Sequence, residues 1–242
     1  MSFPVVEILG VPVASLTMEQ AVEEVESMMD GRRGAIVATA NAEMIMNATS
    51  DRALFDILRG ADLVVPDGAG TVWAARHLGF AMPERVAGYD LVQALLKRAP
   101  EKGRRVFFFG SAPGIAEKAK RKAETLYPGV NVVGTRNGYF TEADEPAIVE
   151  EIRAAAPDLL LAALGVPKQE KWLAKHKEEL GVPVSIGVGG TLDVMAGAVR
   201  RAPLWMQKAK LEWLFRGLLQ PKRAGRLLAL PKFVLRVRAS KK

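Results

Sequence analysis

The aspartate at position 67 has the setting that best suits proton-transfer chemistry. Asp67 comes directly after the apolar run from Asp62 to Val65, in a Pro-Asp-Gly-Ala-Gly turn whose glycines let a ligand or another backbone approach closely. A carboxylate placed in this way can accept a proton from a substrate hydroxyl as a general base. Asp67 could equally be the N-cap of a helix predicted from Thr71 to Leu78, and the residues alone leave both interpretations open.

Two polar residues, Thr39 and Asn41, follow the preceding predicted strand, Ala35 to Ala38. If that strand pairs with the one before Asp67, both side chains lie beside the carboxylate, because ligands of parallel sheets bind beyond the carboxyl ends of the strands. They could then bind the hydroxyls of a sugar. Either could instead cap a helix predicted from Ala42 to Ala48, and both interpretations stay open.

Arg85 and Lys168 are cations placed where a diphosphate could bind. Arg85 lies in a loop without helical periodicity, where it could bind a diphosphate bidentately or pair with Glu84 or Asp90 on the surface. Lys168 and Gln169 fall in the first turn of a predicted helix. An ammonium group there opposes the helix dipole, and a bound phosphate would explain its position.

Glycine turns after two other predicted strands are further candidates. The turn Phe109 to Gly114 has the form of a phosphate site at a helix N-terminus, although every strand-to-helix turn looks somewhat like it. Gly189 and Gly190 offer backbone amides at a strand end, and Asp193 could accept hydrogen bonds from a base or ribose. The alternative for this segment is a tight, well-capped turn.

The rest of the residue inventory limits the chemistry. Cysteine is absent and the only histidines are His77 and His176, which removes thiolate nucleophiles, disulfides and cysteine-type zinc sites. The sequence also lacks an Asp-x-Asp pair that could hold Mg²⁺ against a nucleotide diphosphate. We therefore predict no metal and no cofactor, with leaving-group charge met by arginine, lysine and backbone amides.

Short β-rich apolar runs alternate with amphipathic helical stretches along most of the chain. This rhythm predicts an α/β, Rossmann-like fold in which helices cover both faces of a mostly parallel sheet. We expect residues 1–199 to form this core. The predicted strands are Val5 to Leu9, Ala35 to Ala38, Asp62 to Val65, Arg105 to Phe109, Val130 to Val133, Leu159 to Ala163 and Val184 to Val188.

Capping residues predict the bounds of two early helices. Thr17 and Gln20 match a capping box that begins one helix, and Gly31 is expected to end it. Ser50 is the expected N-cap of a second helix from Asp51 to Arg59.

The last 43 residues differ in charge from the rest of the chain. Thirteen of the 34 basic residues but only one of the 27 acidic residues lie in residues 200–242, which gives this segment +12 and leaves residues 1–199 at −5. Apolar residues recur there at helical spacing, which predicts a basic amphipathic appendage on an anionic membrane surface. Docking of the same stripe onto the core is the alternative. The stripe residues are Leu211, Leu214, Phe215, Leu218 and Leu219, flanked by Trp205 and Trp213, and then Leu227, Leu230, Val234 and Val237.

Signals for export or membrane insertion are not found in the sequence. Residues 1–10 lack a basic region followed by a long apolar one, and no stretch approaches the roughly 18 to 20 apolar residues of a membrane span. We therefore expect a cytoplasmic protein, peripheral to the inner face of the cell membrane.

Eight ordered motifs together resemble the WecG/TagA/CpsF glycosyltransferases. They run along nearly the whole chain, which makes the set far more specific than any one of them. The motifs are Thr39-Ala-Asn-Ala-Glu43, Pro66-Asp-Gly68, Glu84-Arg-Val-Ala-Gly88, Asn137-Gly-Tyr-Phe140, Gly165-Val-Pro-Lys-Gln-Glu170, Gly187-Val-Gly-Gly190, Arg201-Ala-Pro203 and Glu212-Trp-Leu-Phe-Arg216.

The resemblance implies an inverting, metal-independent transferase. Such an enzyme moves N-acetylmannosamine, or its uronic acid, from a UDP-sugar to N-acetylglucosamine on a polyprenyl diphosphate, in wall teichoic acid or surface-polysaccharide synthesis. It also implies self-association into a homo-oligomer. Asp67 is then the candidate base, Thr39, Asn41 and Gln169 line the pocket, and Tyr139 and Asp193 lie near the nucleotide. Arg216, Arg223 and Arg226 are candidate diphosphate ligands from the appendage.

Two other classes of protein would also explain parts of this sequence. A nucleotide-binding protein whose tail binds nucleic acid would also explain the +12 charge of residues 200–242. Phosphate binding does not require leucine and phenylalanine at helical spacing, however, so the apolar stripe argues against this class. A nicotinamide-dependent oxidoreductase is disfavoured because no predicted strand is followed by an intact G-x-G-x-x-G motif. We therefore expect no nucleic-acid partner.

Overall fold

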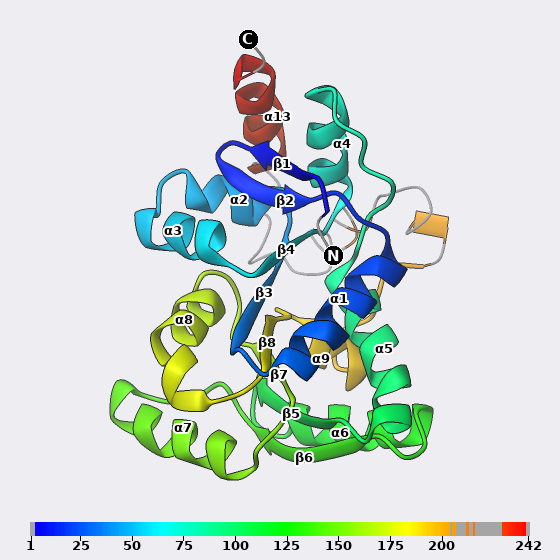
Figure 1. Cartoon of the computed structure of the whole chain (residues 1–242), viewed down its shortest axis with the longest axis vertical. Coiled ribbons are helices and arrows are strands. Elements are labelled where there is room, and N and C mark those ends of the chain that lie inside the picture. Colours follow the sequence, from blue (N-terminus) through cyan, green and yellow to red (C-terminus); the bar gives the residue numbers. More distant parts are fainter. Residues whose placement is uncertain (1–2, 204, 207–211, 213–214, 216–228, 241–242) are drawn as a thin grey trace.

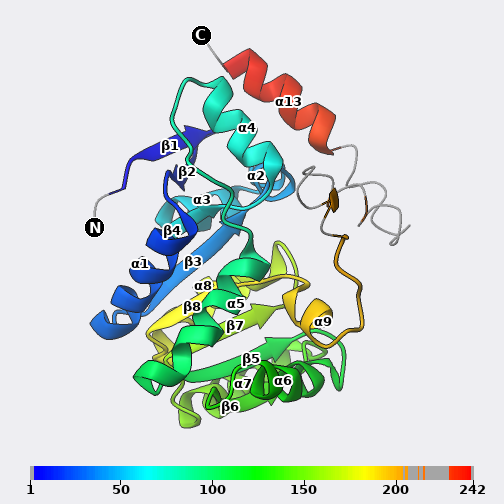
Figure 2. The ribbon, with the colours of Figure 1, turned by 90° about the vertical axis from the view of Figure 1, so that its right-hand side faces the viewer.

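The computed structural model describes residues 3–203, 205–206, 212, 215 and 229–240. At the centre of this described part lies a parallel sheet of six strands, in the order β4-β3-β8-β7-β5-β6 (Figures 1 and 2). The predicted α/β, Rossmann-like fold is confirmed. The strands are β3 (Ala35–Ala40), β4 (Leu63–Pro66), β5 (Arg105–Gly110), β6 (Asn131–Arg136), β7 (Leu159–Ala163) and β8 (Val184–Gly187).

The central strands are continuous apolar runs because both of their faces are covered. Every residue of β3, β4, β7 and β8 is buried, as is usual for parallel sheets. Neighbouring residues of one strand enter different cores, since successive side chains point to opposite faces. In β5, Phe108 packs in the core on one face while Phe107 and Phe109 pack in the core on the other.

Helices on the two faces supply the other half of each core. The first face carries α1 (Met18–Gly31), α5 (Gly88–Arg98), α6 (Ile115–Leu126) and α9 (Thr191–Met195). The second carries α2 (Ala42–Ala48), α3 (Arg52–Gly60), α7 (Glu145–Ala154) and α8 (Lys168–Leu180), with α4 (Ala69–His77) packed beside α2 and β1. The 3-10 turns η1 (Ala99–Lys102) and η2 (Glu142–Asp144) precede β5 and α7.

The first predicted strand does not belong to the parallel sheet. It ends at Ile8 as β1 (Val5–Ile8) and pairs antiparallel with β2 (Val11–Ala14), which the sequence analysis missed. Leu9 and Gly10 form the two-residue loop, with φ values of 50° and 84°. Positive φ at both central residues is the geometry of a tight β-hairpin turn.

Helix ends confirm some capping predictions and correct others. The capping box of Thr17 and Gln20 is present, but α1 continues through Gly31 and its C-cap is Arg32 in the left-handed conformation. The predicted Ser50 cap is wrong. Asp51 caps α3, because its carboxylate accepts the Leu54 N–H (3.1 Å).

The helix α13 (Ala229–Ser240) lies against α2 and α4 at one end of the molecule (Figures 1 and 2). Phe233 and Val237 are fully buried there, and Leu230 packs beside them. Leu235 remains exposed. This part of the predicted stripe therefore docks onto the core, with Phe233 as a member that the periodicity had not identified.

Other residues of the predicted appendage lie outside the described part of the chain. No helix among the described residues is long and apolar enough to cross a membrane. The undescribed residues with a predicted role are Arg216, Arg223 and Arg226, together with Leu211, Trp213, Leu214, Leu218, Leu219 and Leu227 of the stripe.

Candidate functional site

The carboxyl ends of β3 and β4 bring Asp67 beside the turn after β3. The two strands pair in parallel with Ala40 opposite Pro66, and the Asp67 N–H donates to the Ala40 carbonyl (3.0 Å). A β-carbon on Gly68 would stand 3.5 Å from the Asn41 side chain. The predicted neighbourhood of Asp67, Thr39 and Asn41 is therefore confirmed.

Asp67 does not cap the helix that follows it. The N-cap position of α4 is Gly68, at φ 92°, and no side chain of the described residues makes a cap hydrogen bond there. The Thr71 hydroxyl contacts two backbone carbonyls at this turn, those of Ala40 (3.0 Å) and Asp67 (3.2 Å). Of the two roles proposed from the sequence, the structure removes the cap, and the role of base stays a prediction.

Thr39 and Asn41 each make a hydrogen bond inside the protein. Asn41 caps α2, where its Oδ1 accepts the Met44 N–H (2.9 Å). Thr39 is buried and caps no helix, because its hydroxyl donates to the Gly187 carbonyl at the end of β8 (3.1 Å). Thr39 therefore joins the ends of β3 and β8 at the site.

Gln169 and Glu170 form a buried pair between the turns after β7 and β8. Gln169 Oε1 accepts the N–H groups of Gly165 (3.1 Å) and Gly189 (3.0 Å). Its Nε2 donates to Glu170 Oε1 (2.7 Å). The Gly189 amide proposed for a nucleotide is therefore already bonded within the protein, and the neighbouring Gly190 is the N-cap of the short helix α9.

Glu170 is the residue in this region that the sequence analysis missed. Its side chain is 2% exposed, and burial raises its pKa to about 7 while the hydrogen bond from Gln169 opposes the rise. Its Oε2 has no hydrogen-bond partner among the described residues. The signal available in the sequence was an acid next to Gln169 in the first turn of a predicted helix.

The turns after β5, β6 and β8 meet around Ser111. Its hydroxyl donates to Asp193 Oδ2 (3.0 Å), and its carbonyl accepts the Gly138 N–H (2.8 Å). Tyr139, next to Gly138, is 73% exposed. Ser111, from the predicted Phe109 to Gly114 turn, thus links Asp193 to Gly138, the residue next to Tyr139.

Lys168 has a partner within the protein. Its ammonium lies 4.0 Å from the centroid of the Phe140 ring, a cation–π arrangement. The position of Lys168 in the first turn of α8 is as predicted. A phosphate is no longer needed to explain that position, because Phe140 stabilises the charge.

Arg85 belongs to a network of charges that reaches the predicted appendage. Its guanidinium contacts Glu212 (2.5 Å) and lies 4.0 Å from Asp90. Arg201 binds both carboxylate oxygens of Asp90 (2.6 and 2.8 Å), contacts Glu212 (3.2 Å) and stacks over Tyr89. Of the two surface partners proposed for Arg85, Asp90 lies at the limit of an ion pair and Glu84 does not pair with it, while the main partner is the part-buried Glu212.

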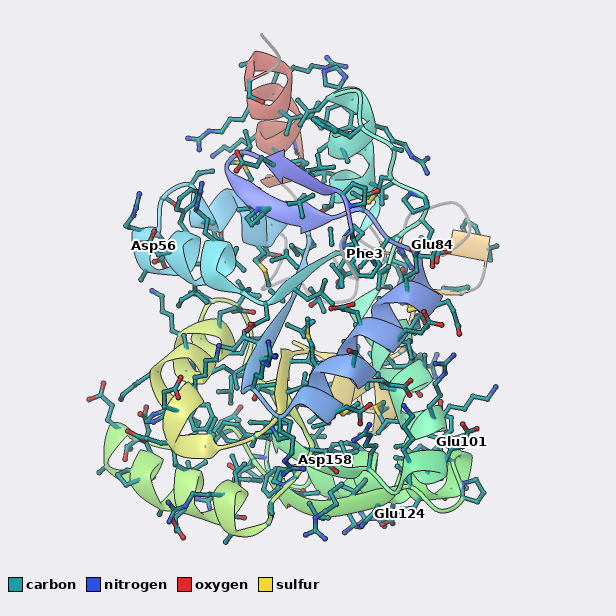
Figure 3. The ribbon with its side chains drawn as sticks, in the orientation of Figure 1. Phe3, Asp56, Glu84, Glu101, Glu124 and Asp158 are labelled. Atoms are coloured by element: carbon teal, nitrogen blue, oxygen red, sulfur yellow. The ribbon has the colours of Figure 1, made fainter. Side chains whose placement is uncertain are left out.

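Glu84, the other acid considered for Arg85, points elsewhere. It lies beside the start of α1, where its carboxylate accepts the Met18 N–H (Figure 3). The partners of Arg85 are therefore Asp90 of α5 and Glu212 of the predicted appendage.

No group of three or more histidine, aspartate or glutamate side chains suited to a metal ion occurs in the described part of the chain.

Comparison with known proteins identifies the relatives of this chain. The sequence profile described as "Glycosyl transferase WecG/TagA/CpsF family" matches residues 6–242. An N-acetylglucosaminyldiphosphoundecaprenol N-acetyl-beta-D-mannosaminyltransferase of Bacillus subtilis (strain 168) is 34% identical over 229 residues, which cover 94% of this chain and 89% of the relative. The protein of the same name from Staphylococcus aureus (strain NCTC 8325 / PS 47) is 33% identical over 239 residues, covering 98% and 93%.

Proposed function

Because the chain belongs to the WecG/TagA/CpsF glycosyltransferase family, we propose that it transfers an N-acetylmannosamine-type sugar from UDP to N-acetylglucosamine on a polyprenyl diphosphate. The product would enter wall teichoic acid or another surface polysaccharide. The observation that carries the proposal in this chain is the setting of Asp67. It follows β4 at the carboxyl edge of the sheet, beside the Thr39 and Asn41 turn, and does not cap α4.

Asp67 acts as the general base in this proposal. Its carboxylate accepts the proton of the acceptor hydroxyl while that oxygen bonds to the anomeric carbon of the donor. The bond from this carbon to the UDP oxygen breaks, and UDP leaves with the electron pair. One base suffices, and the configuration at the anomeric carbon inverts because the acceptor oxygen attacks the face opposite the departing UDP.

Cations and amides would offset the charge of the leaving UDP without a metal ion. We assign this role first to Arg85, because the next residue, Val86, donates its N–H to the Pro66 carbonyl at the end of β4 (3.0 Å). A diphosphate would have to compete with Glu212 for its guanidinium. Lys168 and three appendage arginines, Arg216, Arg223 and Arg226, are the further candidates.

Binding of the sugar and nucleotide is assigned to the turns along the same edge. Thr39, Asn41 and Gln169 are proposed to shape the sugar pocket, within which Gln169 fixes the loop that carries Gly189 and Gly190. Tyr139 and Asp193 are proposed to contact the uridine side. The exposed ring of Tyr139 is suited to stacking on a base.

Because the proposed acceptor is lipid-linked, we propose that the reaction takes place at the anionic inner face of the cell membrane and that residues 200–242 contact this surface. In the described part of this segment, Lys232, Arg236 and Arg238 are exposed on α13 together with Leu235. We also propose that the chain self-associates. Sedimentation with anionic but not zwitterionic vesicles, and light scattering with and without those vesicles, test the two assignments separately.

The decisive assay measures UDP release from UDP-N-acetylmannosamine, with and without a short-chain polyprenyl-diphosphate N-acetylglucosamine acceptor. The Bacillus subtilis relative serves as the active control. We expect release that depends on the acceptor and persists in EDTA. Release that EDTA abolishes would contradict the metal-independent mechanism, and no release beside an active control would contradict the donor or acceptor assignment.

A further inference from the structure

The buried pair of Gln169 and Glu170 has a role in the site that the proposed reaction does not itself assign. We propose that Glu170 is a positioning residue for the transfer, which fixes the Gln169 amide so that it joins the turns after β7 and β8 at the sugar pocket. This inference rests on the proposed function, and it gives no proton-transfer step to Glu170.

Three hydrogen bonds determine which way the Gln169 amide faces. Its oxygen receives two backbone N–H groups, from Gly165 and Gly189, and its nitrogen donates to Glu170 Oε1 (2.7 Å). A reversed amide would set its NH₂ group against two backbone donors and its oxygen against the acceptor on Glu170. Glu170 is therefore the acceptor that completes the observed orientation.

The side chains of Gln169 and Glu170 pack closely against Gly187 at the end of β8. A β-carbon on Gly187 would stand 2.6 Å from Gln169 Nε2 and 3.0 Å from Glu170 Oε1, so only glycine leaves room for the pair. The carbonyl of the same glycine accepts the Thr39 hydroxyl (3.1 Å). The Gln169 amide therefore packs against the strand end whose carbonyl accepts the Thr39 hydroxyl.

The surroundings of Glu170 favour a neutral carboxyl. The adjacent ammonium groups are engaged elsewhere, since Lys171 pairs with Asp51 (2.7 Å) and Lys168 lies over Phe140. The buried Oε2 has no partner among the described residues, and an unpaired buried charge is costly. A neutral carboxyl keeps its carbonyl oxygen as the acceptor for Gln169, so the positioning role does not need a charge.

Two substitutions separate the acceptor from the charge. Glu170→Gln keeps an acceptor oxygen and removes the charge, whereas Glu170→Met fills a similar volume without an acceptor. We expect Glu170→Gln to keep kcat/KM within about threefold of the wild type. Glu170→Met should lower it about tenfold, the scale of one lost hydrogen bond.

A double-mutant cycle tests whether Glu170 acts through Gln169. In a Gln169→Ala background, Glu170→Met should lower kcat/KM by less than about twofold, because the amide it positions is gone. An undiminished tenfold loss in that background would overturn the proposal. So would equal losses in Glu170→Gln and Glu170→Met in the otherwise unchanged chain.

A readout without substrate separates failure of this inference from failure of the proposed function. In ¹⁵N–¹H spectra, Glu170→Met should shift the amide signals of Gly165 and Gly189, whereas Glu170→Gln should leave them close to the wild type. The matched control is Glu145→Met, since Glu145 is a buried acid paired with α8 through His176 and Lys175. Glycine signals unmoved by Glu170→Met, or moved as far by Glu145→Met, would overturn the positioning role even if the chain transferred no sugar.

Discussion

The two halves of the carboxyl edge differ in how their polar side chains are used. Around β7 and β8, Gln169 bonds to backbone amides on two turns and to Glu170, so these groups hold one another in place. Around β4, the backbone carbonyl of Asp67 accepts the Thr71 hydroxyl, and the N-cap of α4 is Gly68, not Asp67. On the proposed function, the half around β7 and β8 maintains the shape of the site, and the half around β4 performs the chemistry.

The largest effect should come from the half assigned to chemistry. Asp67→Asn removes the base but keeps the size of the side chain, so we expect kcat to fall about 10²- to 10⁴-fold, the range of general-base catalysis. Affinity for UDP and the unfolding midpoint should stay near the wild-type values, as measured by calorimetry and urea titration. Near-normal turnover would remove Asp67 as the base and erase the distinction between the two halves.

The half assigned to shape should instead show a pH-dependent stability. The pKa of Glu170 is raised from 4.5 to about 7 by burial, so the folded state holds this proton more tightly than the unfolded state does. The contribution is fully present below pH 4.5 and is lost as the pH rises through 7, an effect of up to about 3 kcal/mol. Urea unfolding across this range should show a smaller loss in Glu170→Gln, and parallel curves for the two proteins would contradict the assignment.

The charge network of Arg85, Arg201, Asp90 and Glu212 is a third region, whose expected contribution is to stability. Arg201→Lys removes the two-pronged contact with Asp90 and should lower the free energy of unfolding by about 1 kcal/mol, because a lysine cannot reproduce the guanidinium geometry. The loss should shrink in high salt. Urea titrations at low and high ionic strength measure the loss of stability and its dependence on salt. Arg153→Lys is the control, because the exposed ion pair of Arg153 with Glu150 should contribute less to the free energy of unfolding.

A further prediction, of similar size, tests the end of β3, which contacts both halves. Thr39→Val removes the hydroxyl that joins β3 to β8 and should cost about 1 kcal/mol of stability, whereas Thr39→Ser should cost less because it keeps the donor. Thermal unfolding of both variants checks this. If valine and serine are equally damaging, the hydrogen bond to Gly187 is not what matters at this position.

The sequence predicts the sheet well because its signal is local. Apolar runs such as Leu159 to Ala163 are bounded by turn residues, and β7 has the bounds that the run predicts. The hairpin β1–β2 was missed because its turn, Leu9-Gly10, has only one residue of the usual turn type. The parallel pairing of β3 with β4, assumed from chain order, is what placed Thr39 and Asn41 beside Asp67.

The parts of the site that could not be predicted depend on contacts between distant segments. Gln169 and Gly189 are 20 residues apart, and Ser111 and Asp193 are 82 apart, so no local pattern reveals that they bond. The pairing of Arg85 with Glu212 spans 127 residues. Residue types identified candidates for binding, but only the fold shows which of them already bind one another.

The measurement that tests the central claim most directly is the anomeric configuration of the transferred sugar. If Asp67 is a base and the acceptor oxygen displaces UDP in one step, an α-linked donor must give a β-linked product. The one-bond C1–H1 coupling of the product, measured by NMR, distinguishes the two configurations. A β product is the result expected here, whereas an α product would exclude a single displacement from the face opposite UDP and would contradict the proposed role of Asp67.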